Sequence, residues 1–482
     1  MLKGWRLTLS KLFFIPQRYI LGIMGFLAVV NAYTMRVSLS IAITEMVAPP
    51  NNTHSVDPDA CIASDSGPKA SVTDKNILYD WDEKTQGLIL SSFYWGYVVS
   101  HLPGGIMAER FGGKYSLGLG ILSTAVFTLI TPWVIYATGG DWKALVLLRV
   151  IVGLGEGTTY PALNALLAKW VPLGERAKLG TLVYAGSQIG TIVSNSISGA
   201  LINATNDWAA VFYLFGSLGI LWFIIWVLLC YSDPDSHPFI SEKEKMFLKK
   251  ELENVHKESP AIPWRQIWTS TPLWALVAAQ VGHDWGFFTM VTDLPKYMSD
   301  VLKFNVKENG FWSSIPYVVM WLVSMGSGSL CDWLITRGYM RITFARKFFT
   351  TVASLGPAIF IMIASYSGCD RYLTVAMFTI AMGFMGTFYC GMKVNALDLS
   401  PNYAGTLMAI VNGLGAITGI FTPYLVGALT EDHTLKQWRV VFWITFAVFN
   451  VSNVIYACFG SGEEQWWNDK EKNKGEKEKD PS

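Results

Sequence analysis

The chain has few charged side chains for its length. Asp, Glu, Lys and Arg together make up 15% of its 482 residues, against roughly 25% in an average soluble protein. Hydrophobic residues make up 51%, and the mean hydropathy is +0.33. A composition this poor in charge indicates a chain that lies mostly in a membrane.

Patterns typical of enzymes and metal proteins are also lacking. The six cysteines show no metal-ligand spacing, the six histidines are scattered, and no Ser/His/Asp arrangement is present. The net charge of +1 gives no indication of nucleic-acid binding. No cleavable signal is evident at the basic start. We therefore expect no enzymatic activity, no resident metal or cofactor, and no nucleic-acid partner.

Long apolar segments are abundant instead. A membrane-spanning helix needs about 20 predominantly apolar residues, and twelve segments meet this need. They lie near residues 18–46, 86–108, 115–137, 144–170, 179–202, 208–231, 268–299, 310–335, 346–366, 372–397, 403–430 and 438–460. The sequence predicts an all-α membrane protein with twelve transmembrane helices.

The distribution of charge predicts the orientation. Basic residues gather before the first segment and in the connections after segments 2, 4 and 8, whereas the connection after segment 1 is long and acidic. Because positive loops stay in the cytoplasm, we place both termini there. Two N-x-Ser/Thr sequons, at Asn51 and Asn203, fall in outer loops and are candidate glycosylation sites. Cys61 and Cys369 also fall in outer loops; a disulfide is open, but we favour free thiols.

Short strings recur in the same order along the two halves of the chain. Their offsets of 223 to 230 residues pair 105–109 with 328–332, 180–182 with 405–407, 199–201 with 427–429, and 208–212 with 438–442. Such repetition indicates two six-helix bundles of one plan. The expected regions are a cytoplasmic N-terminus (1–17), an N-terminal bundle (18–232), a cytoplasmic linker with an amphipathic helix (233–266), a C-terminal bundle (267–461) and a charged, disordered tail (462–482).

A polar motif follows the second segment. Gly105, Glu109, Arg110 and Lys114 have the spacing of the loop signature of the Major Facilitator Superfamily, and Asp332 stands at the repeated position. An acid there can cap a neighbouring helix N-terminus, and remaking such contacts lets two halves rock around a central site. We interpret the motif as a conformational latch; the alternative is an ordinary polar turn.

Several charged residues lie inside the apolar segments. An ion at such depth costs several kcal/mol unless it faces water or a partner, yet Arg36 occupies the first segment. Arg149 and Glu156 share one helix face in the fourth, and His283 and Asp284 occupy the seventh. The pattern predicts a path for an anion. For the fourth segment, a buried Arg–Glu pair that only joins helices stays open.

Roles within this path follow from the chemistry of each side chain. Glu156 can take and release a proton, and His283 can titrate near neutral pH, although a packing role for His283 is open. Lys393, in segment 10, is either a cavity cation or a residue that extends to the membrane surface. Three aromatic residues are candidates for the cavity wall: Tyr33, Phe93 and Tyr94.

The sequence resembles the anion:cation symporters of the Major Facilitator Superfamily, which include sialin, the vesicular glutamate transporters and the type I sodium-dependent phosphate cotransporters. The resemblance covers nearly the whole chain and is greatest to sialin-like and invertebrate inorganic phosphate cotransporter members. It rests on the strings NAYTMRVSLSIAITEMV, SSFYWGYVVSHLPGG, GLGEGTTYPALNALLAKWVPLGER, NALDLSPNYAG and SGEEQ.

This resemblance implies roles for individual residues. Arg36 matches the arginine that engages the substrate anion, Arg149 matches the segment 4 arginine, and Glu156 matches a glutamate implicated in proton coupling. His283 stands where glutamate transporters have arginine. Other positions depart from the relatives: Leu90 replaces a histidine of glutamate transporters, and Val152 and Asn164 replace a glutamate and a histidine of sialin.

We therefore expect a monomeric symporter of small organic or inorganic anions that works by alternating access. Arg36, Arg149, His283 and Tyr33 bind the substrate, and Glu156 couples H⁺, with Na⁺ open. The alternatives are a sodium-dependent inorganic phosphate cotransporter and, in another class, a non-transporting membrane receptor on the same fold. The plasma membrane is favoured, and a lysosomal or vesicular membrane is open.

Overall fold

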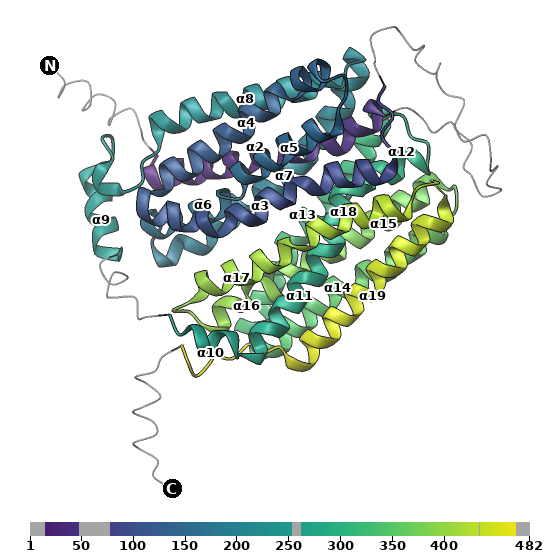
Figure 1. Cartoon of the computed structure of the whole chain (residues 1–482). Helices are drawn as coiled ribbons and strands as arrows, with labels where there is room; N and C mark the ends of the chain where they lie inside the picture. The colour runs from purple at the N-terminus through teal and green to yellow at the C-terminus, as the bar shows by residue number, and fades with distance from the viewer. Residues whose placement is uncertain (1–14, 48–77, 253–261, 433, 469–482) are drawn as a thin grey trace, which may run out of the picture. The chain divides into compact units, whose positions relative to one another are not determined.

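The computed structural model describes residues 15–47, 78–252, 262–432 and 434–468, and nearly all regular structure in them is helical. Each of the twelve predicted segments coincides with one helix or a run of short helices, which confirms the all-α fold (Figure 1). The continuous helices are α2 (Gln17–Met46), α3 (Glu83–Phe111), α4 (Gly113–Ala137), α7 (Leu173–Thr205), α8 (Ala209–Leu229), α13 (Val306–Thr336), α14 (Ile342–Tyr366) and α19 (Leu435–Phe459).

Four of the predicted segments are interrupted. They form α5 (Trp142–Glu156) with α6 (Thr159–Trp170); α11 (Thr271–Phe288), the π-helical turn η2 (Thr289–Asp293) and α12 (Leu294–Asp300); α15 (Arg371–Met385), the 3₁₀ turn η3 (Gly386–Tyr389) and α16 (Met392–Leu399); and α17 (Ala404–Ala416) with α18 (Thr418–Leu429). Gly157 follows α5, Pro295 is the second residue of α12, Gly386 is the first residue of η3, and Gly391 precedes α16. Glycine and proline favour such breaks, which apolar periodicity does not register.

Eight of the described helical stretches are long and apolar enough to cross a membrane on length and composition alone. The other four predicted spans, α3, α5–α6, α7 and α11–α12, are helical but too short or too polar for that test. These four include the segments that carry Arg149, Glu156 and His283. Polar side chains within a span mark functional positions by default.

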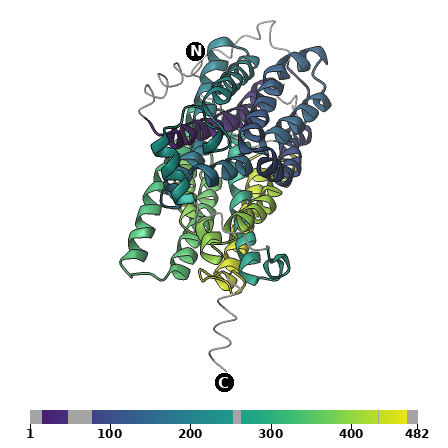
Figure 2. The same cartoon turned by 90° about the vertical axis from the view of Figure 1, so that its left-hand side faces the viewer.

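The chain divides into two compact units. Unit 1 comprises Met1–Asn51, Asp65–Glu258 and Phe304–Ser314, and unit 2 comprises Asn52–Ser64, Ser259–Lys303 and Ile315–Ser482. In unit 1, α2 packs on α7 and α8, and α3 and α4 both pack on α5; in unit 2, α11 packs on α17 and α19, and α14 on α15 and α19. Within each unit the long helices run side by side in both views (Figure 1; Figure 2). The predicted bundle boundaries stay a prediction.

One predicted repeat has a physical counterpart in both units. Trp208 and Phe212 are buried at the start of α8 with ring centroids 5.7 Å apart. Trp438 and Phe442 are buried at the start of α19 with ring centroids 5.9 Å apart. The repeated Trp-x-x-Val-Phe string therefore places a buried Trp–Phe pair at the start of both helices, although the ring planes are 87° apart in α8 and 35° apart in α19.

The linker carries a helix that caps another helix. This is α9 (Glu242–Leu252), which begins where the amphipathic helix was predicted. Its buried Glu244 accepts hydrogen bonds from the backbone N–H groups of Gln17 (2.9 Å) and Arg18 (3.2 Å), where α2 has no side-chain cap of its own. The Arg18 side chain also pairs with Glu244 (3.2 Å) and with Glu175 of α7 (2.8 Å). One carboxylate thus satisfies orphan donors at the start of α2 and fixes α9 there.

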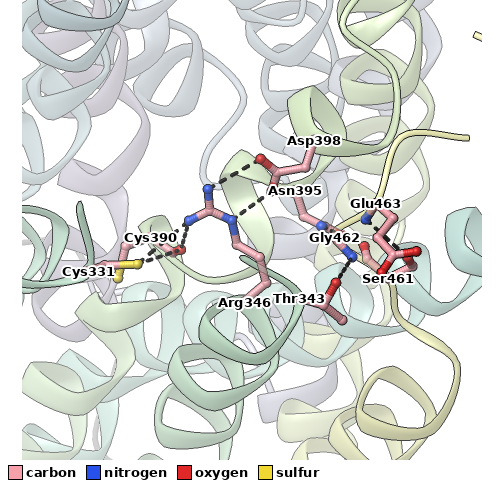
Figure 3. A network of polar contacts seen from close by, with 9 residues as sticks. All are labelled: Cys331, Thr343, Arg346, Cys390, Asn395, Asp398, Ser461, Gly462 and Glu463. Atoms are coloured by element: carbon pink, nitrogen blue, oxygen red, sulfur yellow. Dashed lines mark hydrogen bonds and ion pairs between the residues drawn. The ribbon is translucent and has the colours of Figure 1, made fainter. Parts of the chain in front are cut away.

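A second polar network closes one end of unit 2 (Figure 3). Arg346 of α14 donates Nε to Asp398 Oδ2 (2.7 Å) and Nη1 to the carbonyl oxygen of Cys390 (2.7 Å). Asn395 donates to the carbonyl oxygen of Ser461 (2.8 Å), just beyond α19. Residues 395–401, the first seven of the NALDLSPNYAG string that marks the family resemblance, therefore connect α14 and α16 with the segment after α19.

The start of the predicted tail is ordered, which corrects that part of the prediction. Residues 461–468 follow α19, the Gln465 N–H donates to the Leu399 carbonyl (2.9 Å), and Ser400 Oγ donates to Asn468 Oδ1 (2.5 Å). Trp467 is 1% exposed. The many charged residues of the predicted tail (462–482) concealed Trp467, an apolar side chain that anchors the start of the tail.

The cysteines require another correction. Cys369 is disulfide-bonded, so the free thiol favoured for it was wrong. Cys230, Cys331, Cys390 and Cys458 are free, and Cys61 lies outside the described residues. Separation along the chain does not report which loops meet, and that proximity decides whether a disulfide forms.

We predict that Glu244→Ala lowers the free energy of unfolding by about 1–3 kcal/mol, because it leaves buried donors of α2 and the Arg18 guanidinium without their partner. The measurement is thermal unfolding of the purified protein in detergent. Glu242→Ala is the matched control, since Glu242 lies on the same helix and is exposed. Equal melting temperatures for the two variants would contradict the capping role.

Candidate functional site

Glycines bring the helices of the candidate site into backbone contact. A Cβ atom at Gly153 would lie 2.0 Å from the carbonyl oxygen of Phe93, and one at Gly157 would lie 2.1 Å from Ser100 Oγ. A Cβ at Gly96 would lie 2.0 Å from the Val150 carbonyl oxygen. The backbones of α3 and α5 are therefore in close contact, which brings the aromatic side chains of α3 near the charges of α2 and α5.

Arg36 lies buried on α2 among four aromatic rings. Its Cζ atom is 4.7 Å from the ring centroid of Phe93, 4.8 Å from that of Tyr94, 5.1 Å from that of Tyr33 and 5.5 Å from that of Tyr97. Such contacts attract a guanidinium through the negative face of each ring, more strongly when water is excluded. The rings can thus hold a buried cation without neutralising it.

The carboxylate of Glu156 lies on the other side of this cation. Arg36 Nη1 and Glu156 Oε1 are 3.5 Å apart, and both side chains are nearly fully buried. Arg149 Nη2 donates to the backbone carbonyl of Arg36 (3.4 Å), and its guanidinium lies 5.0 Å from the Phe93 ring centroid. Glu156 therefore forms an ion pair with Arg36 of another helix rather than with Arg149 of its own helix, which was the alternative that the sequence allowed.

This cluster has a positive net charge and reserve hydrogen-bonding capacity. The cluster holds two guanidinium groups, Arg36 and Arg149, and one carboxylate, Glu156, so the formal sum is +1. Within the described residues, Arg149 Nε and Glu156 Oε2 are buried without a hydrogen-bond partner. Buried polar atoms are normally satisfied, so an unpartnered donor and an unpartnered acceptor within one cluster are the features expected of a site for an anion and a proton.

A row of hydroxyl groups continues from the cluster. Tyr160 of α6 donates to the Tyr33 hydroxyl (3.3 Å), and its ring centroid lies 5.7 Å from that of Tyr184 on α7. The Tyr184 hydroxyl bonds to Asn164 Oδ1. The sequence interpretation included Tyr33 and missed Tyr97 and Tyr160. Tyr97 was detectable, since it lies four residues after Phe93 on one face of α3; Tyr160 follows the break after α5.

His283 belongs to unit 2 and is described there separately. It is buried on α11, and its ring stacks on Phe388 with centroids 3.6 Å apart. Its Nδ1 atom is buried without a partner in the described part of the chain.

The predicted latch residues have different surroundings. Lys114 is buried at the start of α4, where Nζ donates to the carbonyl of Val227 in the last turn of α8 (2.9 Å). Arg110 and Asp332 are exposed, and Gly105 faces Pro161 of α6. The side chain of Glu109 lies outside the described residues. Of the sequons, Asn203 is exposed in the last turn of α7, and Asn51 lies outside the described residues.

The chain belongs to the Major Facilitator Superfamily, whose sequence profile matches residues 21–423. Within it, the chain belongs to the group predicted from its motifs. It is 40% identical over 452 residues to a Drosophila ananassae protein named "Putative inorganic phosphate cotransporter", covering 92% of each chain. It is also 40% identical to human sialin (93% of this chain, 90% of sialin) and 33% identical to vesicular glutamate transporter 1 of Xenopus tropicalis (96% and 78%).

Solved structures show the same fold. A bacterial homolog of the human lysosomal transporter Spinster superposes with a TM-score of 0.67 at 13% identity, covering 92% of this chain and 96% of its own. A D-xylose-proton symporter gives 0.67 at 13% identity, covering 92% and 98%. The chain is therefore a multi-pass membrane protein of a transporter family, and the prediction that it is not an enzyme is confirmed.

We predict that Gly153→Ala destabilises the protein, because a methyl group there collides with rigid backbone of α3 and forces the two helices apart. A loss of about 1–3 kcal/mol is expected, measured by thermal unfolding. Gly413→Ala is the control, since no atom lies within 4 Å of a Cβ at Gly413. Alanine favours a helix over glycine by roughly 0.5–1 kcal/mol, so a Gly153→Ala protein as stable as the control would disprove the close approach.

Proposed function

We propose that the chain is a secondary active symporter of small organic or inorganic anions, coupled to a cation and working by alternating access. The proposal rests on the buried cluster around Arg36, which has a net positive charge and includes Arg149 Nε, a donor without a hydrogen-bond partner among the described residues. Relatives named for inorganic phosphate, and those named sialin and vesicular glutamate transporter, support an anionic cargo.

The proposed coupling follows from competition for one guanidinium. Arg36 binds the anion together with Arg149 and Tyr33 of unit 1, and His283 of unit 2 is proposed separately as a substrate-binding residue. Glu156 already occupies one side of Arg36 at 3.5 Å. An anion and an ionised carboxylate beside the same cation repel each other, so substrate binding favours a proton on Glu156. The proton and the anion then travel together.

The cation and the cargo each have an alternative. Drive by Na⁺ is the alternative to drive by H⁺. Inorganic phosphate is the alternative cargo, since one relative is named as an inorganic phosphate cotransporter and phosphate satisfies two arginines as well as a carboxylate does. We further propose cytoplasmic termini, a monomer in the lipid bilayer, glycans at Asn51 and Asn203, and a latch formed by the segment 2 motif and Asp332. The plasma membrane is favoured over a lysosomal or vesicular one.

We predict that Arg36→Ala abolishes anion uptake, with a loss of at least about a hundredfold, because the main charged partner of the substrate is removed. Purified protein is placed in liposomes, and uptake of labelled phosphate, glutamate, aspartate and sialic acid is measured under separate H⁺ and Na⁺ gradients. The control is Arg265→Ala, since Arg265 is exposed on α10 (Trp264–Trp268). If the Arg36→Ala variant transports anions at the wild-type rate, the anion site does not include Arg36. If the wild-type protein binds anions but does not transport them, a receptor is favoured.

We predict that Glu156→Gln removes the dependence of uptake on the proton gradient, because an amide keeps the size of the side chain but cannot exchange a proton. Exchange of labelled for unlabelled anion, without a net gradient, should persist. Glu242→Gln, on the exposed face of α9, should behave as wild type. Uptake that Glu156→Gln leaves fully dependent on the proton gradient would remove the coupling role.

A further inference from the structure

A second pair of charged side chains, the buried Asp284 and the partly buried Lys393, lies in unit 2, where α11, α16 and α17 pack together. Lys393 of α16 donates Nζ to Asn412 Oδ1 of α17 (2.6 Å). Asp284 of α11 accepts from Gln280 Nε2 at both oxygens, at 2.8 and 2.9 Å. Both groups meet α17, Asp284 at Gly415 and Lys393 at Asn412. Neither residue has a role in the transport scheme above.

Helix α17 is shaped to receive these groups. A Cβ atom at Gly415 would lie 2.2 Å from Asp284 Oδ2 and 2.7 Å from Gln280 Cγ. Any larger residue would therefore displace the carboxylate. Asn412 lies three positions earlier on the same face of α17. One face of this helix thus admits the carboxylate and holds the ammonium.

Lys393 keeps donors in reserve. A lysine ammonium has three N–H donors, and Asn412 accepts one of them in the described part of the chain. The partner is a neutral amide rather than a carboxylate. Arg346 of the same unit differs, because Asp398 and the Cys390 carbonyl engage its guanidinium at 2.7 Å each. A structural cation is satisfied in that way, and Lys393 is not.

Unpartnered polar atoms lie on the helix that faces Lys393. His283 Nδ1 and Gln280 Oε1 are buried on α11 without a hydrogen-bond partner among the described residues, and the two side chains are 6% and 3% exposed. His283 stacks on Phe388, and Lys393 Nζ lies 5.9 Å from the centroid of the same ring. The imidazole and the ammonium therefore border one aromatic ring, with polar capacity left on both.

We propose that Lys393 and Asn412 form a second oxyanion-binding site in unit 2, with His283 beside it and Asp284 as its counter-charge. The ligand class is a small carboxylate or phosphate, since an ammonium binds such groups as a point charge. The inference rests on the proposed transport of anions and adds a site to it. Asp284 balances Lys393 before the anion binds and competes with the anion afterwards.

This competition gives a signature that a purely structural ion pair lacks. Lys393→Gln removes the charge that attracts the anion and should raise the Kd by about tenfold or more. Asp284→Asn removes the competing carboxylate, retains a polar group of similar size, and should lower the Kd several-fold. Lys393→Arg keeps the charge and should stay near wild type. In a structural pair, both neutralising variants would destabilise the protein without opposite effects on affinity.

The test is equilibrium binding of radiolabelled inorganic phosphate, and separately of radiolabelled glutamate, to the purified full-length chain. The oxyanion class is identified by the labelled anion whose Kd rises in Lys393→Gln and falls in Asp284→Asn. Arg346→Gln is the control, which should lower the melting temperature and leave the Kd unchanged. If Lys393→Gln and Asp284→Asn both leave the Kd unchanged, or both weaken binding, the second site is overturned. Uptake by the wild-type protein and by the Arg36→Ala variant is measured in parallel. If the wild-type protein transports the anion and the variant does not, the transport proposal stands whatever the outcome for the second site. If the wild-type protein itself shows no uptake, the transport proposal is wrong.

Discussion

The cost of holding Arg36 in an apolar interior is the constraint that organises unit 1. A charge at that depth is expensive unless other groups replace its hydration. Four aromatic rings and one carboxylate share this task, and Arg149 attaches to the backbone carbonyl of Arg36 rather than to its charge. The rings stabilise the cation while leaving its charge available. An aliphatic lining would not, and a second carboxylate would cancel the field that attracts an anion.

Glycine makes this arrangement geometrically feasible. The aromatic side chains of α3 reach the charged side chains of α2 and α5 because α3 and α5 approach closely, which Gly96, Gly153 and Gly157 permit. Unit 2 uses the same device, since Gly415 admits Asp284 against α17. The segments that carry Arg149, Glu156 and Asp284 are too short or too polar to count as membrane spans on length and composition alone. Their stability therefore depends on helix contacts more than on partition into lipid.

The sequence was sufficient to predict the positions of the helices and to single out the charged residues inside them. Apolar length predicts spans because each must satisfy its own backbone in lipid, and Arg36 and Glu156 are conspicuous because ions are rare there. It did not reveal that Glu156 pairs with Arg36, that Glu244 caps α2, or that Tyr160 bonds to Tyr33. Those contacts depend on helix rotation and on breaks such as the one after Glu156, which a single sequence does not encode visibly.

Ion pairs in this chain fall into two kinds. Arg18 with Glu175 and Arg346 with Asp398 have N–O distances of 2.8 and 2.7 Å, and their cations make additional hydrogen bonds. They join helix ends and loops. Arg36 and Glu156 are 3.5 Å apart with Glu156 Oε2 unpartnered, and Lys393 bonds to an amide near Asp284. A saturated pair resists exchange, whereas an incomplete one gains from a ligand. By this criterion we propose that the incompletely paired ions carry the transport chemistry and that the saturated ones hold the helices that position them.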